Sequence, residues 1–296
     1  MAVYLRQVLG KQSLTMSKRY FGSLNVAKAP AHDAHPTSTA AFNTNHSLYD
    51  QFRPSHYPAA ADALIGKLEL PPNAHVLDLA CGTGKFTALL ENRGFEITAV
   101  DASEGMLASF KKNYPTIPAQ VGSSYSIPAK DHSLDALFCA QAFHWFADLE
   151  SLKEFHRVLK PTTGKLALIW NFDPSADESS VWQRKVAELC WDNDAHLPQF
   201  RHMNWKKVFE SSGAVDLFEM PPKFETMFWS FKIKPQDVYQ LWLTKSYITE
   251  LSDLDKLKIK AGIEQILDAH AKELYDQDGL LDYYMGVYYT WTTAKP

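Results

Sequence analysis

The residues most able to do chemistry gather where two apolar runs end. The first run holds Asp78 and closes on Gly82 and Gly84, and glycine allows a positive φ and lets a ligand approach main-chain atoms without meeting a Cβ. The second run ends at Asp101, whose carboxylate can accept hydrogen bonds from both hydroxyls of a ribose. A helix-like segment follows the glycines. The pattern predicts a nucleotide-binding turn between a strand and a helix.

The kind of nucleotide depends on the neighbouring residues. A dinucleotide fingerprint requires Gly or Ala three residues after its second glycine, for close packing and contact with pyrophosphate. Thr87 occupies that position, so the fingerprint is incomplete. The acid at Asp101 alone fits both nicotinamide and adenosylmethionine enzymes. A carboxylate at Asp78 suits a cationic ligand end better than a pyrophosphate, which favours the second class.

Four segments follow one another at the spacing of a known family. They are DLACGTG (78–84), VDASEGML (100–107), QAFHWF (141–146) and RVLKP (157–161), the last followed by GKLAL (164–168). Through these segments the chain resembles the S-adenosylmethionine-dependent methyltransferases with a Rossmann-like fold, in the small-molecule branch similar to trans-aconitate methyltransferase-like proteins. The resemblance covers about residues 46–172 and is loose over the remaining third of the chain.

The resemblance implies S-adenosyl-L-methionine as the cofactor. It implies that Arg53 holds the methionine carboxylate, with a surface ion pair as the alternative. It also implies that Met106 lies against the adenine face, although a core position fits a Met there equally well. Where many relatives carry an acid for the adenine amino group, this chain has Ser123 and Ser124. The candidate cofactor-binding residues are Tyr49, Arg53, Asp78, Ala80, Gly82, Gly84, Asp101, Ala102, Met106, Ser123, Ser124, Gln141 and Ala142.

The candidate acceptor site follows the expected fourth strand, because ligands of open α/β sheets lie beyond the carboxyl ends of the strands. By resemblance, His144 and Trp145 face the transferred methyl group or the acceptor, and His144 is the candidate catalytic base. A hydrogen-bonded structural histidine and core aromatics are the alternatives. The candidate acceptor-binding residues are Tyr57, Phe143, Trp145, Trp229, Trp242 and Tyr247.

The reaction that the resemblance implies is in-line displacement at a sulfonium methyl group. The enzyme mainly aligns the acceptor and excludes water, and such positioning lowers a barrier by about 7–11 kcal/mol in favourable cases. A carboxylate needs orientation alone, whereas an alcohol or amine benefits from a base. Because the family includes carboxylate methylators, we expect O-methylation of a small organic acid or partly hydrophobic metabolite. The alternatives are a cyclase or isomerase that retains the cofactor, and a non-catalytic partner subunit.

Composition excludes several other classes of partner. A net charge of −4 gives no basic field for nucleic acid. No apolar run reaches the roughly 18 residues of a membrane span. The three cysteines lack a C-x-x-C pattern and the histidines lack ligand spacing, so we expect no metal. We expect a cytoplasmic protein, or a mitochondrial one, because residues 1–32 are basic and contain no acid. Nothing in the sequence sets the oligomeric state.

Alternating strands and helices are needed to position these residues. We expect strands at 76–80, 95–100, 119–122, 134–139 and 165–170, with helices at 59–70, 85–93, 104–113 and 151–159. The alternation predicts an α/β fold with a doubly wound, mostly parallel seven-stranded sheet whose last strand, at 282–292, is antiparallel. The aromatic-rich stretch after the fifth strand predicts a helical cap, with two helices over 236–275.

These elements divide the chain into four expected parts. Residues 1–45 form an N-terminal arm and linker, and residues 46–172 form the cofactor-binding core. Residues 173–275 form the cap over the acceptor site, and residues 276–296 return as the final strand of the core sheet. An apolar cap over the carboxyl edge of the sheet would enclose the water-poor pocket that a small molecule requires.

Overall fold

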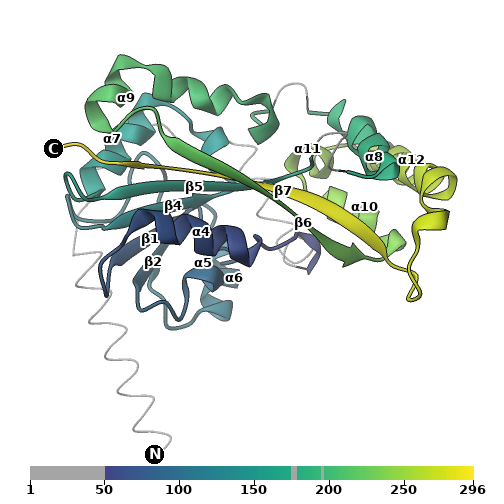
Figure 1. Cartoon of the computed structure of the whole chain (residues 1–296), viewed down its shortest axis with the longest axis horizontal. Coiled ribbons are helices and arrows are strands. Elements are labelled where there is room, and N and C mark those ends of the chain that lie inside the picture. The colour runs from purple at the N-terminus through teal and green to yellow at the C-terminus, as the bar shows by residue number, and fades with distance from the viewer. Residues whose placement is uncertain (1–50, 175–178, 195–196) are drawn as a thin grey trace, which may run out of the picture.

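The computed structural model describes residues 51–174, 179–194 and 197–296, so Tyr49 and the expected arm over 1–45 lie outside the described residues. The described chain forms one seven-stranded sheet in the order β3-β2-β1-β4-β5-β7-β6 (Figure 1). The strands are β1 (His75–Leu79), β2 (Glu96–Asp101), β3 (Ala119–Val121), β4 (Ala136–Ala140), β5 (Lys165–Phe172), β6 (Lys223–Ile233) and β7 (Leu281–Thr293).

The strand directions confirm the expected doubly wound fold. β1 pairs in parallel with β2 and β4, β2 pairs in parallel with β3, and β4 pairs in parallel with β5. β7 runs antiparallel to β5 and to β6, as expected for the last strand. The sheet is therefore a Rossmann-like parallel half joined to an antiparallel edge.

The edge strand β6 comes from the stretch that the sequence placed in the cap. Phe224 and Phe228 are exposed, and half-buried and exposed side chains alternate from Glu225 to Lys232. An alternation with period two is typical of a strand that has one covered face. The aromatic-rich stretch is therefore shared between the sheet and the cap.

Helices cover both faces of the parallel half (Figure 1). α4 (Pro58–Leu68), α5 (Thr87–Leu90) and α6 (Glu104–Asn113) lie on one face, and α7 (Leu149–Val158) and α9 (Ser212–Leu217) lie on the other. Buried apolar side chains of these helices pack against those of the strands on each face, so the sheet lies between two apolar layers.

Local sequence explains where two of these helices begin and end. α6 spans the expected residues 104–113, and the Ser103 hydroxyl caps it by accepting from the Met106 N–H at 3.1 Å. α5 is shorter than the expected 85–93, because the glycine loop extends to Phe86 and Glu91 already has an extended backbone.

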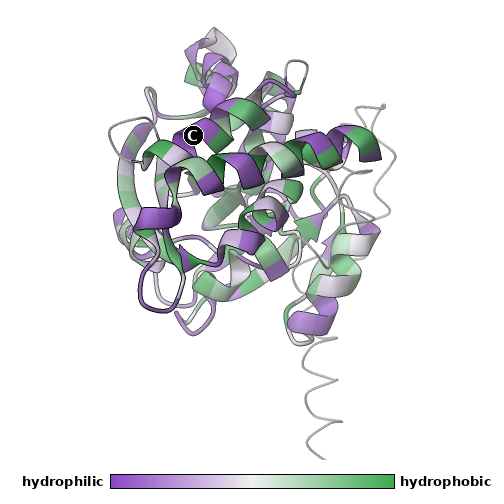
Figure 2. Ribbon diagram, turned by 90° about the vertical axis from the view of Figure 1, so that its right-hand side faces the viewer, coloured by the Kyte–Doolittle hydropathy of each residue, from purple (hydrophilic) through white to green (hydrophobic). Residues whose placement is uncertain are grey.

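The remaining helices gather around the ends of β6 and β7 and form the cap. They are α8 (Val181–Trp191), α10 (Pro235–Leu243), α11 (Ser246–Thr249) and α12 (Asp253–His270), with short 3₁₀ helices η1 (Phe143–Trp145), η2 (Phe200–His202), η3 (Asn204–Glu210) and η4 (Lys272–Leu274) elsewhere in the described chain. Hydrophilic and hydrophobic residues interleave along the helices nearest the viewer in Figure 2, as in amphipathic helices.

The helices of the cap also differ from the expectation. Two helices were expected over 236–275, whereas the structure divides this stretch among α10, α11, α12 and η4, so Trp242 and Tyr247 lie on different helices. α12 buries Ile259, Ile263 and Leu267, which are four residues apart and share one face. Within the described residues, no helix combines the length and apolar composition needed to cross a membrane.

The topological switch point of the sheet lies between β1 and β4. The chain runs outward from β1 through β2 to β3 and returns on the other side of β1 as β4. Ligands of open α/β sheets bind in the crevice at such a point. Ala80 and Gln141, which follow these two strands, have φ of 56° and 61°, a region that residues other than glycine seldom adopt. Two of the eight described non-glycine residues with positive φ therefore lie at this crevice.

Candidate functional site

The glycine loop after β1 is held by main-chain hydrogen bonds. The Cys81 N–H donates to the Val100 carbonyl at 3.1 Å, and the Gly84 N–H donates to the Cys81 carbonyl at 3.0 Å. Gly82 and Gly84 have φ of 56° and 95°. A Cβ added at Gly82 would meet no atom within 4 Å, whereas one at Gly84 would overlap the ring of Tyr114. Gly82 therefore leaves room for a ligand, and Gly84 allows close packing of the loop.

Asp101 is oriented by the same loop. Its Oδ2 accepts from the Gly82 N–H and its Oδ1 accepts from the Ser103 N–H, both at 2.8 Å. Burial raises the pKa of Asp101, while these hydrogen bonds from Ser103 and Gly82 oppose the rise. The carboxylate group thus has a fixed orientation at the end of β2.

Asp78 is fully buried beneath the loop. Its Oδ2 accepts a hydrogen bond from the Thr87 hydroxyl at 2.6 Å, and its Oδ1 has no hydrogen-bond partner within the described chain. Burial raises the pKa of Asp78 to about 7, although the hydrogen bond from Thr87 opposes the rise. A buried polar atom without a partner costs about 1–3 kcal/mol, which a donor on a ligand would offset. Thr87, which breaks the dinucleotide pattern, thus orients this acid.

A small cavity lies between the glycine loop and the residues that end β4. Its lining combines carboxyl, imidazole and main-chain groups with one position that has no Cβ. The lining residues are His56, Asp78, Ala80, Cys81, Gly82, Thr83, Lys85, Phe86, Ala140 and Gln141. We call this space the loop cavity.

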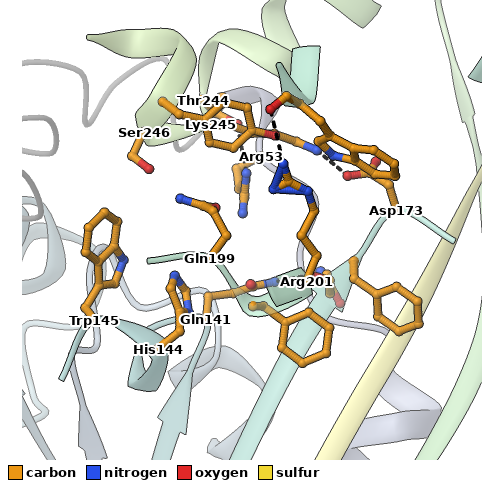
Figure 3. A pocket seen from close by; sticks show the side chains of 15 residues that line it. Arg53, Gln141, His144, Trp145, Asp173, Gln199, Arg201, Thr244, Lys245 and Ser246 are labelled. Atoms are coloured by element: carbon orange, nitrogen blue, oxygen red, sulfur yellow. Dashed lines mark hydrogen bonds and ion pairs between the residues drawn. The ribbon is translucent and has the colours of Figure 1, made fainter. Parts of the chain in front are cut away.

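A second cavity shares Gln141 with the loop cavity, so the two spaces are neighbours. We call it the acceptor cavity. Its lining residues are Arg53, Gln141, His144, Trp145, Asn171, Phe172, Asp173, Trp191, Gln199, Phe200, Arg201, Thr244, Lys245, Ser246 and Tyr247. In Figure 3, Gln141 and His144 at the sheet edge face Arg53 and Gln199 across this space. The cavity is therefore walled by both the core and the cap.

His144 lines the acceptor cavity as a neutral ring. Its Nδ1 lies 3.1 Å from Nε1 of Trp170, and an indole N–H only donates, so Nδ1 must be the acceptor. The neutral ring therefore carries its proton on Nε2. Burial lowers the pKa of His144 to about 3, with further contributions from Arg53 and His202. Near pH 7, His144 offers a hydrogen-bond donor and no free lone pair, which does not suit the catalytic base expected from the sequence.

A buried ion pair forms part of the same wall. Lys245 pairs with Asp173, whose other oxygen accepts from the Tyr283 hydroxyl at 2.8 Å. Burial raises the pKa of Asp173, but the adjacent Lys245 lowers it and the net direction is downward. Both oxygens of this carboxylate are thus engaged and it is ionised near pH 7.

Cationic side chains outnumber carboxylates in the described part of the cavity wall. Arg53, Arg201 and Lys245 line it together with one carboxylate, that of Asp173, which leaves a net charge of +2 while the histidine is neutral. Arg201 also pairs with Asp194 behind the wall, and counting Asp194 leaves +1. The cavity therefore favours an anionic ligand.

The structure brings eight of the nineteen candidate residues that it describes to these two cavities. Asp78, Ala80, Gly82 and Gln141 line the loop cavity. Arg53, Gln141, His144, Trp145 and Tyr247 line the acceptor cavity.

Two expected acceptor contacts lie instead in the core. Phe143 is fully buried and packs against Phe155, because the turn of η1 directs it away from the sheet edge, and Ala142 packs against the same cluster. Trp242 is also fully buried, and the ammonium of Lys245 lies 3.5 Å from its ring centre. Their large apolar surfaces are buried by packing within the protein.

Two further aromatic candidates form a pair outside both cavities. Tyr57 stacks on Trp229 with 5.3 Å between ring centres and 6° between ring planes. Tyr57 also precedes α4, and its carbonyl accepts from the first turn of that helix. This pair joins the N-terminal segment to β6 and has a packing role.

The remaining cofactor-binding candidates follow β2 and β3 in the chain and line neither cavity. Ala102 is half-buried and follows the acid at the end of β2, and Met106 is buried on α6. The Ser123 hydroxyl accepts from the Tyr125 N–H at 3.3 Å within a tight turn, and Ser124 is buried. The hydroxyl of Ser123 is therefore already used within its own loop.

Several residues that line the cavities were not predicted from the sequence. Arg201 and Lys245 lie in the part of the chain with the loosest resemblance, and no spacing pattern marks them. Asn171 lies near the end of the apolar strand β5 and Asp173 follows that strand, positions that could have indicated the carboxyl edge. His56 lies three residues after Arg53, and no motif in the sequence marks it. Among the described residues, no group of three potential ligands could hold a metal ion.

Known proteins match most of the described chain. Residues 77–168 match a family model described as a methyltransferase domain. The chain is 31% identical over 226 residues to an uncharacterized methyltransferase-like protein of Schizosaccharomyces pombe, with 76% of this chain and 85% of the relative covered. It is 38% identical over 136 residues to a malonyl-[acyl-carrier protein] O-methyltransferase of Methylococcus capsulatus, with 44% and 47% covered. The structure of a putative type II methyltransferase from Anaeromyxobacter dehalogenans aligns with a TM-score of 0.57 at 20% identity, covering 83% of this chain and 99% of that one.

Proposed function

The chain belongs to the S-adenosylmethionine-dependent methyltransferases, and from that premise we propose that it methylates a carboxylate oxygen of a small anionic molecule. The observation that carries the proposal is the hydrogen bond from Trp170 to Nδ1 of His144, which leaves a donor and no base at the sheet edge. An alcohol or amine must lose a proton during methyl transfer, whereas a carboxylate is already ionised near pH 7. A wall of donors without a base suits a carboxylate.

The groups around the glycine loop suit those of the cofactor. S-Adenosylmethionine supplies a methyl group that is activated by its bond to a sulfonium. In our proposal Asp101 accepts from the ribose hydroxyls, since a carboxylate retains lone pairs beyond the two used by Gly82 and Ser103. Asp78 faces the cationic methionine end, because its Oδ1 lacks a partner among the described residues. The open Cβ position of Gly82 leaves space for the ligand to pass.

The acceptor cavity supplies orientation and charge. In our proposal Arg53 and Arg201 attract the acceptor's negative charge, and Nε2 of His144 donates to one carboxylate oxygen, which directs the other toward the loop cavity. Trp145 and Tyr247 help to exclude water from the junction between the cavities.

Two other ionisable side chains of the described wall, Asp173 and Tyr247, do not suit the role of base. Asp173 has both oxygens engaged by Lys245 and Tyr283. Burial raises the pKa of Tyr247 well above its ordinary range, so this phenol stays protonated. The relative from Methylococcus capsulatus is named as an O-methyltransferase, which supports oxygen as the accepting atom.

The test is methyl transfer to matched acceptors. The purified chain is incubated with methyl-labelled S-adenosylmethionine and with sets of short acids, their amides and the corresponding alcohols. We expect label in the acids alone, release of the label as volatile methanol after mild base, and one S-adenosylhomocysteine for each ester. Label in alcohols or amides that resists base would contradict the carboxylate. Acceptor conversion without S-adenosylhomocysteine would contradict methyl transfer.

A pair of arginine variants tests the placement of the acceptor. Arg53→Gln should lower kcat/KM for acids by about tenfold or more. Tenfold is the smaller end of the effect expected when a charge-assisted hydrogen bond is lost. Arg93→Gln serves as the control, because Arg93 pairs with Asp62 on an exposed helical surface. Equal activity of both variants would remove Arg53 from the acceptor site.

A further inference from the structure

His56 is a buried side chain at the loop cavity to which nothing above assigns a role. It has an exposed fraction of 5% and lines the cavity together with Asp78. Its Nδ1 is buried and has no hydrogen-bond partner in the described parts of the chain. This leaves two buried polar atoms without partners at one cavity, Nδ1 of His56 and Oδ1 of Asp78.

The position of His56 is fixed by its neighbours. Asn171 donates from Nδ2 to the Ser55 carbonyl at 3.1 Å, which ties this segment to the end of β5. The imidazole meets the Phe86 ring edge-on, with 5.5 Å between ring centres and 85° between planes. Directly after His56 in the chain, the Tyr57 carbonyl accepts hydrogen bonds from the first turn of α4. The ring is thus held at the cavity by its contact with Phe86 and by the hydrogen-bonded main chain before and after it.

We propose that His56 is a cofactor-binding residue that accepts, at Nδ1, a hydrogen bond from the α-ammonium of the S-adenosylmethionine methionine moiety. The proposal rests on the placement of the cofactor in the loop cavity given above. In this arrangement the ammonium lies between two acceptors, the imidazole of His56 and the carboxylate of Asp78. The imidazole carries its proton on Nε2.

The chemistry of the two unpartnered atoms selects the ammonium among the parts of the cofactor. An ammonium offers three donors and no acceptor, which matches a site with two acceptors. The methionine carboxylate offers no donor, so it cannot pair with the unprotonated Nδ1 of His56, and the ionised form of Asp78 would repel it. In the proposed placement, the ribose hydroxyls are bound by Asp101, whose Oδ2 accepts from the Gly82 N–H.

The charge state of His56 agrees with this role. Burial lowers the pKa of His56 to about 3, and nearby Arg53 and Lys85 lower it further. The ring is therefore neutral and does not repel a cation.

The experiment compares two ligands on four forms of the full chain. One ligand is S-adenosylhomocysteine, and the other is its analogue in which hydrogen replaces the α-amino group. The forms are wild type, His56→Phe, His56→Asn and His270→Phe. Phenylalanine keeps the edge contact with Phe86 without a nitrogen, and asparagine places an amide oxygen near the position of Nδ1. His270 is exposed at the end of α12 and serves as the control.

We expect His56→Phe to weaken S-adenosylhomocysteine about ten- to a hundredfold in calorimetric titration, the range for a lost hydrogen bond to a charged group. The same variant should bind the analogue as the wild type does. His56→Asn should recover part of the loss, and His270→Phe should change neither affinity. Thermal melting of each variant without ligand checks that it is folded.

Three results would overturn the proposal. Equal weakening of both ligands by His56→Phe would make His56 a residue that only shapes the cavity. Unchanged affinity for both would place the ammonium elsewhere. If both His56 variants fail to fold, the wild type decides, because equal wild-type affinity for the two ligands would exclude a bound ammonium. Failure of the wild type to bind S-adenosylhomocysteine would instead refute the placement of the cofactor itself.

Discussion

Replacing Asp78 by Asn should separate the contribution of this acid to folding from its contribution to ligand binding. Asp78 is fully buried, and only its Oδ2 has a described partner, the Thr87 hydroxyl at 2.6 Å. Asparagine keeps an acceptor for Thr87 and cannot ionise. The substitution therefore removes the charge with little change in volume.

The magnitude follows from the pKa of Asp78, which burial raises from 3.8 to about 7. Below pH 3.8 the carboxyl is protonated in both the folded and the unfolded chain. Between pH 3.8 and about 7 only the folded chain holds the proton, so stability falls as the pH rises through this interval. The fall is about 1.4 kcal/mol for each pH unit, or about 4 kcal/mol in total, and Asp78→Asn should lack it.

The assay is urea unfolding of both forms at several pH values from 4 to 8. We expect the difference in free energy of unfolding, variant minus wild type, to rise by about 1.4 kcal/mol per pH unit up to about pH 7 and then to level off. Comparing the two forms at each pH cancels the titration of shared groups that do not interact with Asp78, whereas Asp101, whose charge raises the pKa of Asp78, stays coupled to it. The slope is also independent of how well the asparagine amide is hydrogen-bonded.

The same unfolding experiment with ligand completes the test. S-Adenosylhomocysteine at a hundred times its Kd should stabilise the wild type by about 2.7 kcal/mol, and Asp78→Asn should gain much less at the same concentration because the ammonium has lost its carboxylate partner. A difference in stability that does not vary with pH would refute the reasoning, since it would mean that folded Asp78 is already ionised at low pH. Equal stabilisation of both forms by ligand would remove Asp78 from the site.

Five further variants at four positions address other parts of the site. Asp101→Ala should weaken S-adenosylhomocysteine about a hundredfold in calorimetry by removing the acceptor for the ribose hydroxyls, and unchanged affinity would exclude Asp101. Gly82→Ala should fold but lose ligand affinity, whereas Gly84→Ala should lower the melting temperature because its Cβ overlaps the ring of Tyr114; the reverse pattern would contradict these roles. His144→Gln keeps a hydrogen-bond donor and should retain most of kcat, whereas His144→Leu should lower kcat at least tenfold. A hundredfold loss of kcat in both variants would indicate that His144 removes a proton from the acceptor.

The parallel half of the fold was predictable because its signals are local. Each strand there is a short apolar run, and the glycines and acids mark where β1 and β2 end. β6 was not predictable in the same way. Its alternation of exposed and half-buried residues includes Phe224 and Phe228 on the exposed side, so the apolar pattern that identifies a strand is blurred.

The site was predictable only where one chain segment supplies it. The loop around Gly82 and the acid Asp101 stand at fixed spacing in the sequence, and the structure keeps them in contact. The acceptor cavity joins Arg53, Arg201 and Lys245, which are far apart along the chain and meet only through tertiary packing. The separation of Phe143 from the cavity also depends on a turn whose direction no local pattern specifies.

The junction between β1 and β4 holds features that a purely structural core would avoid. Ala80 and Gln141 have left-handed backbones, and Asp78 and His56 each bury a polar atom without a partner in the described chain. Each feature costs on the order of 1–3 kcal/mol, and the costs fall within one crevice. An ammonium between Asp78 and His56 would offset two of them without any change in the backbone. Ligand binding and stability are therefore coupled through the same atoms, and His56→Phe should reduce the stabilisation by S-adenosylhomocysteine while it leaves that by the analogue without the amino group unchanged.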